Sequence, residues 1–268
     1  MLKQRIITAA ILIPITLLIL IYFPPMPFAI VTAALMIGAA WEWSALMQLT
    51  RNSQRFAYLA LILVCCYAVL FVPVIYMLSI AFLWWVLAVL LVISYPNATN
   101  YWRHPIVRGA MGILVLVPCW GAVNFIRNQH EGLFILFYVF ALIWGADIAA
   151  YFAGRKWGKT KLLPEVSPGK SLQGFIAALI YSVLFAVVFS WYAEVAPGVL
   201  PWAILLSIVT VCFSVVGDLT ESMLKRFVGV KDSGTILPGH GGLLDRIDSL
   251  TAAAPIFALG ALLIGAYL

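Results

Sequence analysis

Four residues near the end of an apolar stretch are spaced so that they would form one polar face of a helix. Asp218, Glu221, Ser222 and Lys225 follow an i, i+3, i+4, i+7 pattern, and residues with that spacing share one side of an α-helix. A carboxylate inside an apolar span is costly and usually marks a functional site, so Asp218 is a candidate. For Glu221 and Lys225, an ordinary ion pair at the helix end is the simpler interpretation.

A second group of carboxylates opens the last apolar stretch. Asp245 and Asp248 are three residues apart, with Arg246 between them. Capping of the helix N-terminus is one explanation for Asp248. Together with Asp218, however, these residues offer hard oxygen ligands, and Mg²⁺ prefers one or two carboxylates with water and phosphate oxygens. We predict that Asp218 and Asp245 bind Mg²⁺, with Asp248 as a third ligand or a supporting partner, in a polyphosphate site.

The segment between these carboxylates is rich in cations and glycine. It contains Lys225, Arg226 and Lys231, followed by Pro238-Gly239-His240-Gly241-Gly242. Glycine allows phosphate oxygens to approach backbone N–H groups closely. Interfacial anchoring of the cations and a plain flexible turn are the alternatives. We predict that the three cations hold phosphates and that His240 and the neighbouring glycines shape a nucleotide site.

A second polar segment, 155–171, contains further candidates. Lys170 and Ser171 stand at its end, and we expect both to reach the same site. Asp147 lies about two turns before the segment on a predicted helix. A hydrogen-bond network within that helix through Tyr151 is the alternative to a role for Asp147 in the wall of the site.

The segment from Ser222 to Asp248 resembles the signature of the phosphatidate cytidylyltransferases, also called CDP-diacylglycerol synthases. It reads S-M-L-K-R, four residues, K-D-S-G, three residues, P-G-H-G-G, two residues, D-R-I-D, without a departure from the family pattern. Three upstream stretches are similar to the family's middle region: Trp144–Asp147, Gly154-Arg155 and Ser167–Ser171. The family often has a second basic residue where this chain has Gly169, so that position offers no basic side chain to a phosphate.

The resemblance implies a nucleotidyltransferase that transfers a cytidylyl group from CTP to phosphatidate, giving CDP-diacylglycerol and pyrophosphate for phospholipid biosynthesis. It also implies a bacterial inner (cytoplasmic) membrane location, Mg²⁺ with K⁺ as a further candidate ion, and a homodimer. We predict catalytic roles for Asp218, Lys225, Arg226, Lys231, Asp245 and Asp248. We predict substrate-binding roles for Lys170, Ser171, Ser222, His240, Gly241, Gly242, Arg246 and Asp147.

Composition determines the solvent in which these residues must be positioned. Of 268 residues, 65% are hydrophobic and 10% are charged, whereas soluble domains are near half apolar and a quarter charged. The excess apolar surface requires a bilayer. The net charge of +6 fits basic cytoplasmic loops rather than nucleic-acid binding. The four cysteines lie in apolar stretches, so we expect neither a disulfide nor a zinc site.

Apolar stretches of about 20 residues predict an all-α protein with about nine transmembrane helices. The predicted spans are 6–23, 27–49, 56–72, 76–94, 109–126, 133–153, 172–193, 199–219 and 249–268. With a cytoplasmic N-terminus, every Lys and Arg except Arg127 falls on the cytoplasmic side, as the positive-inside rule requires. We predict one membrane domain, 1–268, comprising N-terminal helices (1–130) and a catalytic half (131–268) with two cytoplasmic polar loops.

Three other functions remain as alternatives. A transporter would place polar, broken helices in two related halves, whereas the polar groups here lie in one half. A lipid-alcohol kinase would also need a nucleotide and Mg²⁺, and a structural scaffold would leave the polar segment without a purpose. Glu42, between Trp41 and Trp43, resembles an interfacial aromatic belt but lies deeper, and we favour a structural role for it.

Overall fold

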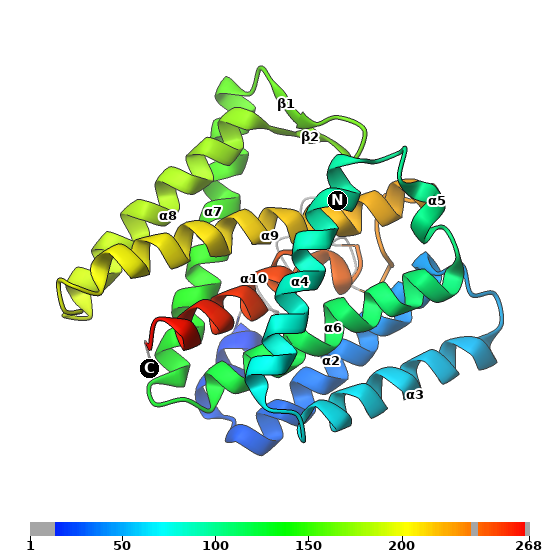
Figure 1. Ribbon diagram of the computed structural model, residues 1–268, viewed down its shortest axis with the longest axis horizontal. Helices are drawn as coiled ribbons and strands as arrows, with labels where there is room; N and C mark the ends of the chain where they lie inside the picture. Colours follow the sequence, from blue (N-terminus) through cyan, green and yellow to red (C-terminus); the bar gives the residue numbers. More distant parts are fainter. Residues whose placement is uncertain (1–13, 237–240, 266–268) are drawn as a thin grey trace.

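The computed structural model describes residues 14–236 and 241–265, and these form a helical bundle (Figure 1). Residues 14–22 are helical. The remaining helices are α2 (Pro25–Leu46), α3 (Asn52–Val69), α4 (Val74–Ile93), α5 (Thr99–Trp102), α6 (Pro105–Arg127), α7 (Gly132–Trp157), α8 (Leu172–Tyr192), α9 (Leu200–Val228) and α10 (Leu244–Leu263). The strands β1 (Lys161–Leu163) and β2 (Ser167–Ser171) form one hairpin.

Eight of the described helices are long and apolar enough to cross a membrane. They correspond to the second to ninth predicted spans, which confirms the all-α, multi-pass architecture. The predicted turn near Pro73 is present, because α3 ends at Val69 and α4 begins at Val74. The first predicted span, 6–23, lies partly outside the described residues. The sidedness of the termini stays a prediction.

Segment 155–171 differs from the loop that we expected. Helix α7 continues to Trp157, and β1 and β2 then pair antiparallel, with Lys161 opposite Ser171 and Leu163 opposite Ser167. The strands have only three and five residues, too few to show the alternating pattern by which strands are recognised in a sequence. The hairpin brings Lys170 and Ser171 back to the start of α8.

Helix α9 extends well beyond the predicted span 199–219. Its 29 residues correspond to about 44 Å of helix at 1.5 Å per residue, whereas the hydrocarbon core is about 30 Å thick. The polar end of α9 can therefore project from the hydrocarbon. The helix ends at Gly229, whose positive φ of 76° allows the N–H groups of residues 229 and 230 to close the last turn.

Helices α9 and α10 cross closely below this polar end. A Cβ atom on Gly217 would overlap the backbone carbonyl oxygen of Asp248. Only glycine therefore allows the two backbones to approach so closely at this point. As a result, the carboxylates of α10 lie next to the polar face of α9.

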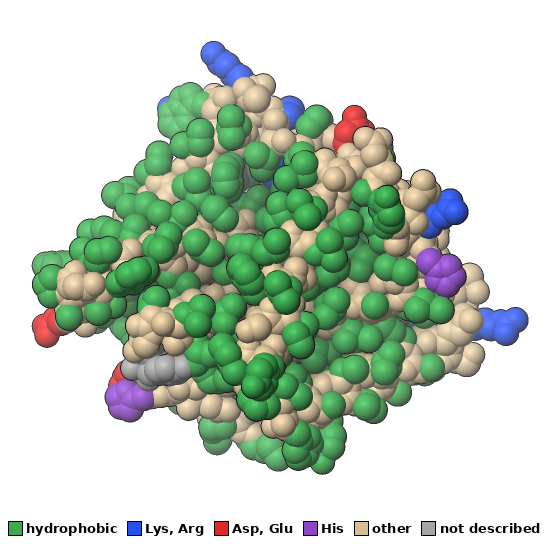
Figure 2. All heavy atoms as spheres, viewed as in Figure 1, with side chains coloured by type: hydrophobic (Ala, Val, Ile, Leu, Met, Phe, Trp, Pro, Cys, Tyr) green, Lys and Arg blue, Asp and Glu red, His purple; other side chains and the backbone are tan. Residues whose placement is uncertain are grey.

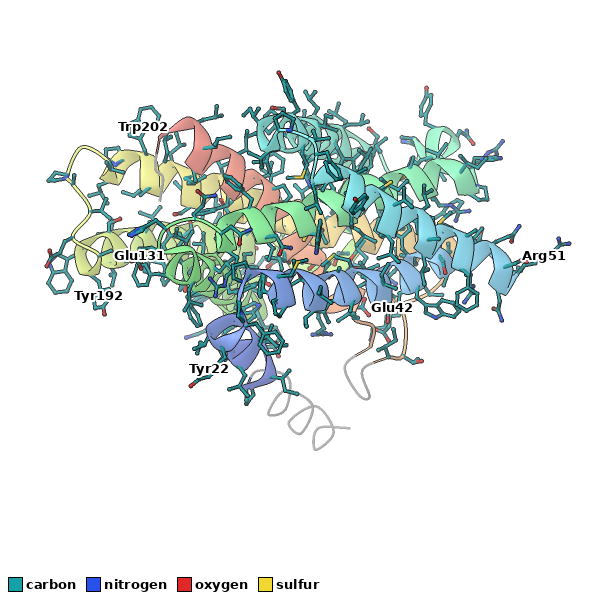
Figure 3. The ribbon with its side chains drawn as sticks, turned by 90° about the horizontal axis from the view of Figure 1, so that it is seen from below. Tyr22, Glu42, Arg51, Glu131, Tyr192 and Trp202 are labelled. Atoms are coloured by element: carbon teal, nitrogen blue, oxygen red, sulfur yellow. The ribbon has the colours of Figure 1, made fainter. Side chains whose placement is uncertain are left out.

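The surface is arranged as a bilayer requires. Figure 2 shows a face covered largely by hydrophobic side chains, with charged side chains near its edges. Arg51 lies at one end of the bundle, while Glu131, Tyr192 and Trp202 lie at the other (Figure 3). These two ends carry loops that we predicted on opposite sides of the membrane. Most of the residues in the apolar stretches of α6 and α10 are buried, so these helices form the centre of the bundle.

Candidate active site

The predicted polar face of α9 is present. The Ser222 hydroxyl donates to Asp218 Oδ1 over 3.2 Å. One turn further, Lys225 Nζ lies 3.0 Å from Glu221 Oε1, which confirms the expected ion pair. Glu221 is 3% exposed, so this pair is buried within the protein rather than at a solvated helix end.

Asp245 joins the first turn of α10 to α9. Lys225 Nζ donates to Asp245 Oδ1 over 2.6 Å, and the backbone N–H groups of Ser233 and Gly242 donate to Oδ2 over 3.0 and 2.8 Å. The side chains of Lys225 and Asp245 are only 11% and 8% exposed. Lys225 therefore lies between two carboxylates. Asp245 in turn accepts hydrogen bonds from Lys225 and from the backbone of Ser233 and Gly242, so it connects α9 to the segment before α10.

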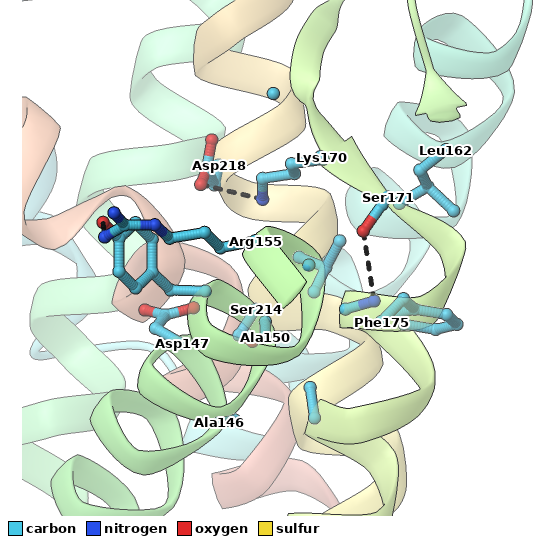
Figure 4. Close-up of a pocket in the computed structure, with 16 residues that line it drawn as sticks. Ala146, Asp147, Ala150, Arg155, Leu162, Lys170, Ser171, Phe175, Ser214 and Asp218 are labelled. Carbon is cyan, nitrogen blue, oxygen red and sulfur yellow. Dashed lines mark hydrogen bonds and ion pairs between the residues drawn. The ribbon is translucent and has the colours of Figure 1, made fainter. Parts of the chain in front are cut away.

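A cavity of about 390 Å³ lies beside α9, between α7, α8 and the hairpin (Figure 4). Its polar end contains Lys170 from β2 and Asp218 from α9, whose Nζ and Oδ2 atoms are 2.8 Å apart. The rest of its lining consists mainly of small or apolar residues: Ala146, Ala150, Gly154, Leu162, Gly174, Phe175, Ala178 and Val215. The cavity therefore combines a charged end with an apolar body.

Asp147 and Arg155 line the same cavity from α7. Arg155 Nη1 donates to the Tyr151 hydroxyl over 3.4 Å. The alternative to a site role for Asp147 was a hydrogen-bond network through Tyr151. Among the described residues, the Arg155–Tyr151 hydrogen bond of that network is present, but no hydrogen bond joins Asp147 to Tyr151. Asp147 instead lines the cavity together with Lys170 and Asp218.

Ser171 combines a structural role with its position in the cavity wall. It is the N-cap residue of α8, and its hydroxyl oxygen accepts the N–H of Gly174 over 3.2 Å. Ser and Thr at an N-cap satisfy one of the free N–H groups of the first turn. Because Lys170 immediately precedes this cap, the start of α8 also fixes the backbone that carries the lysine.

Asp248 lies between the two sides of the site. Its Oδ1 accepts the N–H of Ser249 over 2.7 Å, and it interacts electrostatically with Asp218 and, more weakly, with Lys170 and Lys225. Asp248, Glu221 and Thr220 are among the residues that line a space of about 10 Å³, the size of one water molecule. Asp248 thus lies near both lysine–carboxylate pairs of the site.

Three cations of the predicted site are exposed, and one predicted residue lies outside the described part of the chain. Lys231 and Arg246 lie on the surface. Arg226 is also exposed, and its Nε donates to the Val166 carbonyl over 3.2 Å, which holds the hairpin against α9. His240 lies outside the described residues. Gly241 has a positive φ of 82°, and Gly242 contacts Asp245 as described above.

The chemistry of the carboxylates fits Mg²⁺, although they do not form a complete cage. Among the residues that the structure describes, no group of three or more His, Cys, Asp or Glu side chains is arranged to hold a metal ion. Asp218 and Asp245 are each paired with a different lysine. Mg²⁺ commonly binds through one or two carboxylates and takes its other oxygens from water and substrate phosphates. Asp218 and its electrostatic neighbour Asp248 could supply such a pair.

The sequence interpretation underestimated two carboxylates. Glu221 was expected to form an ordinary ion pair at the helix end; the pair is present, but the side chain is buried within the site. Glu42 of α2 is 2% exposed and accepts hydrogen bonds from residues adjoining Asp245. The sequence signal for Glu42 was its position as a carboxylate in an apolar span. Its hydrogen-bond partners could not be predicted, because they are about 190 or more positions away in sequence.

Comparison with known proteins assigns the chain to a family. The model of the cytidylyltransferase family matches residues 3–263. The chain is 42% identical to a phosphatidate cytidylyltransferase of Haemophilus influenzae, covering 96% of this chain and 98% of the relative. It is 43% identical to that of Pseudomonas aeruginosa, over 96% of each chain, and 38% identical to that of Bacillus subtilis, over 63% of each. The matched region includes both polar segments and all the residues that line the cavity, and the chain therefore belongs to the cytidylyltransferase family.

Proposed function

We propose that this chain transfers a cytidylyl group from CTP to phosphatidate, forming CDP-diacylglycerol and pyrophosphate in a bacterial membrane. The observation that carries the proposal is the cavity beside α9. Its charged end contains Lys170 and Asp218, and its body is apolar. A phospholipid has the same division between an anionic headgroup and apolar chains. The names and high identity of the full-length relatives support the same reaction.

The reaction brings two polyanions together, and the lysines of the site would reduce their repulsion. An oxygen of the phosphatidate phosphate attacks the α-phosphorus of CTP, a new P–O–P bond forms, and the bond to the β-phosphate breaks with pyrophosphate as the leaving group. No general base is needed, because the attacking phosphate is already ionised. Positioning and electrostatic stabilisation supply most of the catalysis in such transfers.

We assign the positioning of phosphates to the cations along the polar face of α9. Lys170 would contact phosphate at the polar end of the cavity, and Lys225 at the α10 side. Arg226, Lys231 and Arg246 are exposed and would contact the parts of the substrates nearest to water. Lys170 is now paired with Asp218, and Lys225 with Glu221 and Asp245, so phosphate would compete with these carboxylates for the two ammonium groups.

We also propose Mg²⁺, with the pair Asp218 and Asp248 as the residues that would hold it and Asp245 as a third ligand once its side chain rearranges. Such an ion would neutralise charge on the nucleotide phosphates. The donor chemistry and the electrostatic coupling of Asp218 to Asp248 support this assignment. Asp245 would have to exchange one of its present hydrogen bonds for the metal. A titration of activity with Mg²⁺ and K⁺ in metal-free buffer tests both ions.

We propose further that the protein lies in the inner membrane with its N-terminus and both polar segments in the cytoplasm. The distribution of Lys and Arg supports this orientation, and CTP is a cytoplasmic nucleotide. Cysteine-labelling of exposed positions at the two bundle ends, in intact and permeabilised cells, tests it. The homodimer rests on the family resemblance, and a mass measurement in detergent tests it.

Position-specific labelling of CTP distinguishes the proposed reaction from its alternatives. In detergent with phosphatidate, label from the α-phosphate of CTP should enter lipid, and label from the γ-phosphate should leave as pyrophosphate. A lipid-alcohol kinase would instead transfer the γ-phosphate label to a lipid alcohol, so a parallel reaction contains diacylglycerol in place of phosphatidate. If purified protein moved neither label to lipid under a full range of metal ions, the proposed function would be wrong.

A further inference from the structure

Glu42 is a buried carboxylate from the N-terminal helices that reaches into the site. It lies on α2 beside the segment that leads into α10 (Figure 3), and it is 2% exposed. Its Oε2 accepts the Ser233 hydroxyl over 3.1 Å and the N–H of Leu244 over 2.8 Å. Its Oε1 accepts the N–H of Leu243 over 3.0 Å. One carboxylate thus satisfies two backbone N–H groups and a hydroxyl.

These hydrogen bonds cap α10 from another helix. The N-cap residue of α10 is Leu243, whose side chain cannot accept a hydrogen bond. The first N–H groups of a helix have no partner within the helix, and the positive end of the helix dipole favours a carboxylate there. Glu42 fills the role that Ser, Asp or Asn usually fills within the same helix.

Glu42 and Asp245 hold the same residues from two sides. Ser233 donates its hydroxyl to Glu42 and its backbone N–H to Asp245. Gly242 donates to Asp245, and the next two N–H groups donate to Glu42. The position of Asp245, and through it that of Lys225, therefore depends on a carboxylate from α2.

The backbone of the segment that leads into α10 packs tightly around the Glu42 carboxylate. A Cβ atom on Gly234 or Gly242 would overlap the Glu42 carboxylate, so the backbone packs directly against it. Among the described residues, no Lys, Arg or His forms an ion pair with Glu42. The partners of the Glu42 carboxylate are therefore the N–H groups and the positive dipole end of α10. These interactions tie the Glu42 side chain to the start of α10.

We propose that Glu42 is a positioning residue for cytidylyl transfer, which fixes the first turn of α10 so that Asp245 and Lys225 meet the nucleotide phosphates. The inference rests on the proposed function. Glutamine at this position keeps the shape of the side chain, but its amide nitrogen cannot accept a backbone N–H. One of the two N–H groups of α10 would then lose its acceptor.

The test compares Glu42→Gln with Glu131→Gln, which removes an exposed carboxylate at the opposite end of the bundle. For Glu42→Gln we expect kcat to fall about 10- to 100-fold, as for loss of one hydrogen bond to a charged group. The KM for CTP should rise in the same variant. A smaller folded fraction would lower the apparent kcat but leave KM unchanged, so the rise in KM distinguishes positioning from a purely structural role.

Amide hydrogen exchange of residues 241–250 gives a second result that does not depend on activity. We expect faster exchange there in Glu42→Gln than in wild type or Glu131→Gln, with unchanged exchange in α7. Wild-type KM for CTP together with wild-type exchange in Glu42→Gln would overturn the proposal. If Glu42→Gln does not fold, Ser233→Ala, which removes one hydrogen bond to the same carboxylate, must show both effects or the proposal fails.

The two proposals fail in different ways. If wild-type protein has no cytidylyl-transfer activity, the proposed function is wrong, and exchange still reports whether Glu42 holds α10. If wild-type protein is active and Glu42→Gln matches it in both measurements, only the positioning role is wrong.

Discussion

Replacing Asp245 with asparagine should cost both activity and stability, whereas the same replacement at Asp218 should cost activity alone. Asp245 and Lys225 form a buried pair with side chains 8% and 11% exposed. Asp218 and Lys170 form a pair with side chains 29% and 24% exposed. The two carboxylates are both predicted site residues, but their surroundings differ, so their contributions to folding should differ.

The expected magnitudes follow from this burial. Removing one partner of a buried ion pair costs about 3–5 kcal/mol. Glu221 remains 3.0 Å from Lys225 Nζ and keeps one negative charge there, so we expect about 3 kcal/mol for Asp245→Asn. A partly exposed pair contributes about 0–1 kcal/mol, which is our expectation for Asp218→Asn. At roughly 2–4 °C per kcal/mol, the Tm should fall by about 6–12 °C for Asp245→Asn and by at most about 4 °C for Asp218→Asn.

The assay is thermal unfolding of the purified variants in one detergent. The measured quantity is the fraction of protein that remains monodisperse after heating. Turnover of labelled CTP is measured on the same samples below the lowest Tm. We expect both variants to lose nearly all turnover, because each removes a carboxylate from the proposed substrate and metal site. Equal Tm values for the two variants would refute the argument from burial. Near wild-type turnover in Asp218→Asn would remove that residue from the site.

Three further predictions test the surroundings of the site. Lys170→Met should lower turnover about 100-fold by removing a charged phosphate contact, with a change in stability below about 1 kcal/mol; equal turnover would place the substrates elsewhere. Gly217→Val should lower the Tm by several degrees and abolish turnover, because the valine side chain would overlap the α10 backbone. The control is Gly169→Ala, which should behave as wild type because the space around Gly169 is open. Arg51→Ala, at the exposed end of α3, should retain turnover within about twofold, as surface substitutions away from a site usually do.

Much of the fold could be predicted because hydrocarbon imposes a simple rule on sequence. A membrane helix needs a long apolar stretch, and eight such stretches coincide with described helices. The limits of α9 could not be predicted in this way, because its last turns carry polar and charged residues and so lack the apolar signal. The hairpin was also missed, since its short strands are held by Arg226 and by pairing rather than by a pattern of their own.

The candidate site was predicted in part. The spacing of Asp218, Ser222 and Lys225 was sufficient to place them on one face, because helix geometry fixes which residues are neighbours. The partners of these residues could not be derived from spacing. Lys170 reaches Asp218 only because the hairpin returns to α8, and Asp245 reaches Lys225 only because α10 crosses α9 closely at Gly217.

The sequence by itself determined that the chain lies in a membrane, which segments cross it and which polar residues could do chemistry. These properties depend on local composition and on the period of the helix. Tertiary structure alone decided that the carboxylates are divided between two lysines, that a cavity lies on one side of α9, and that Glu42 caps α10. Each of these depends on contacts between residues far apart in sequence, and such contacts arise only when whole helices pack together.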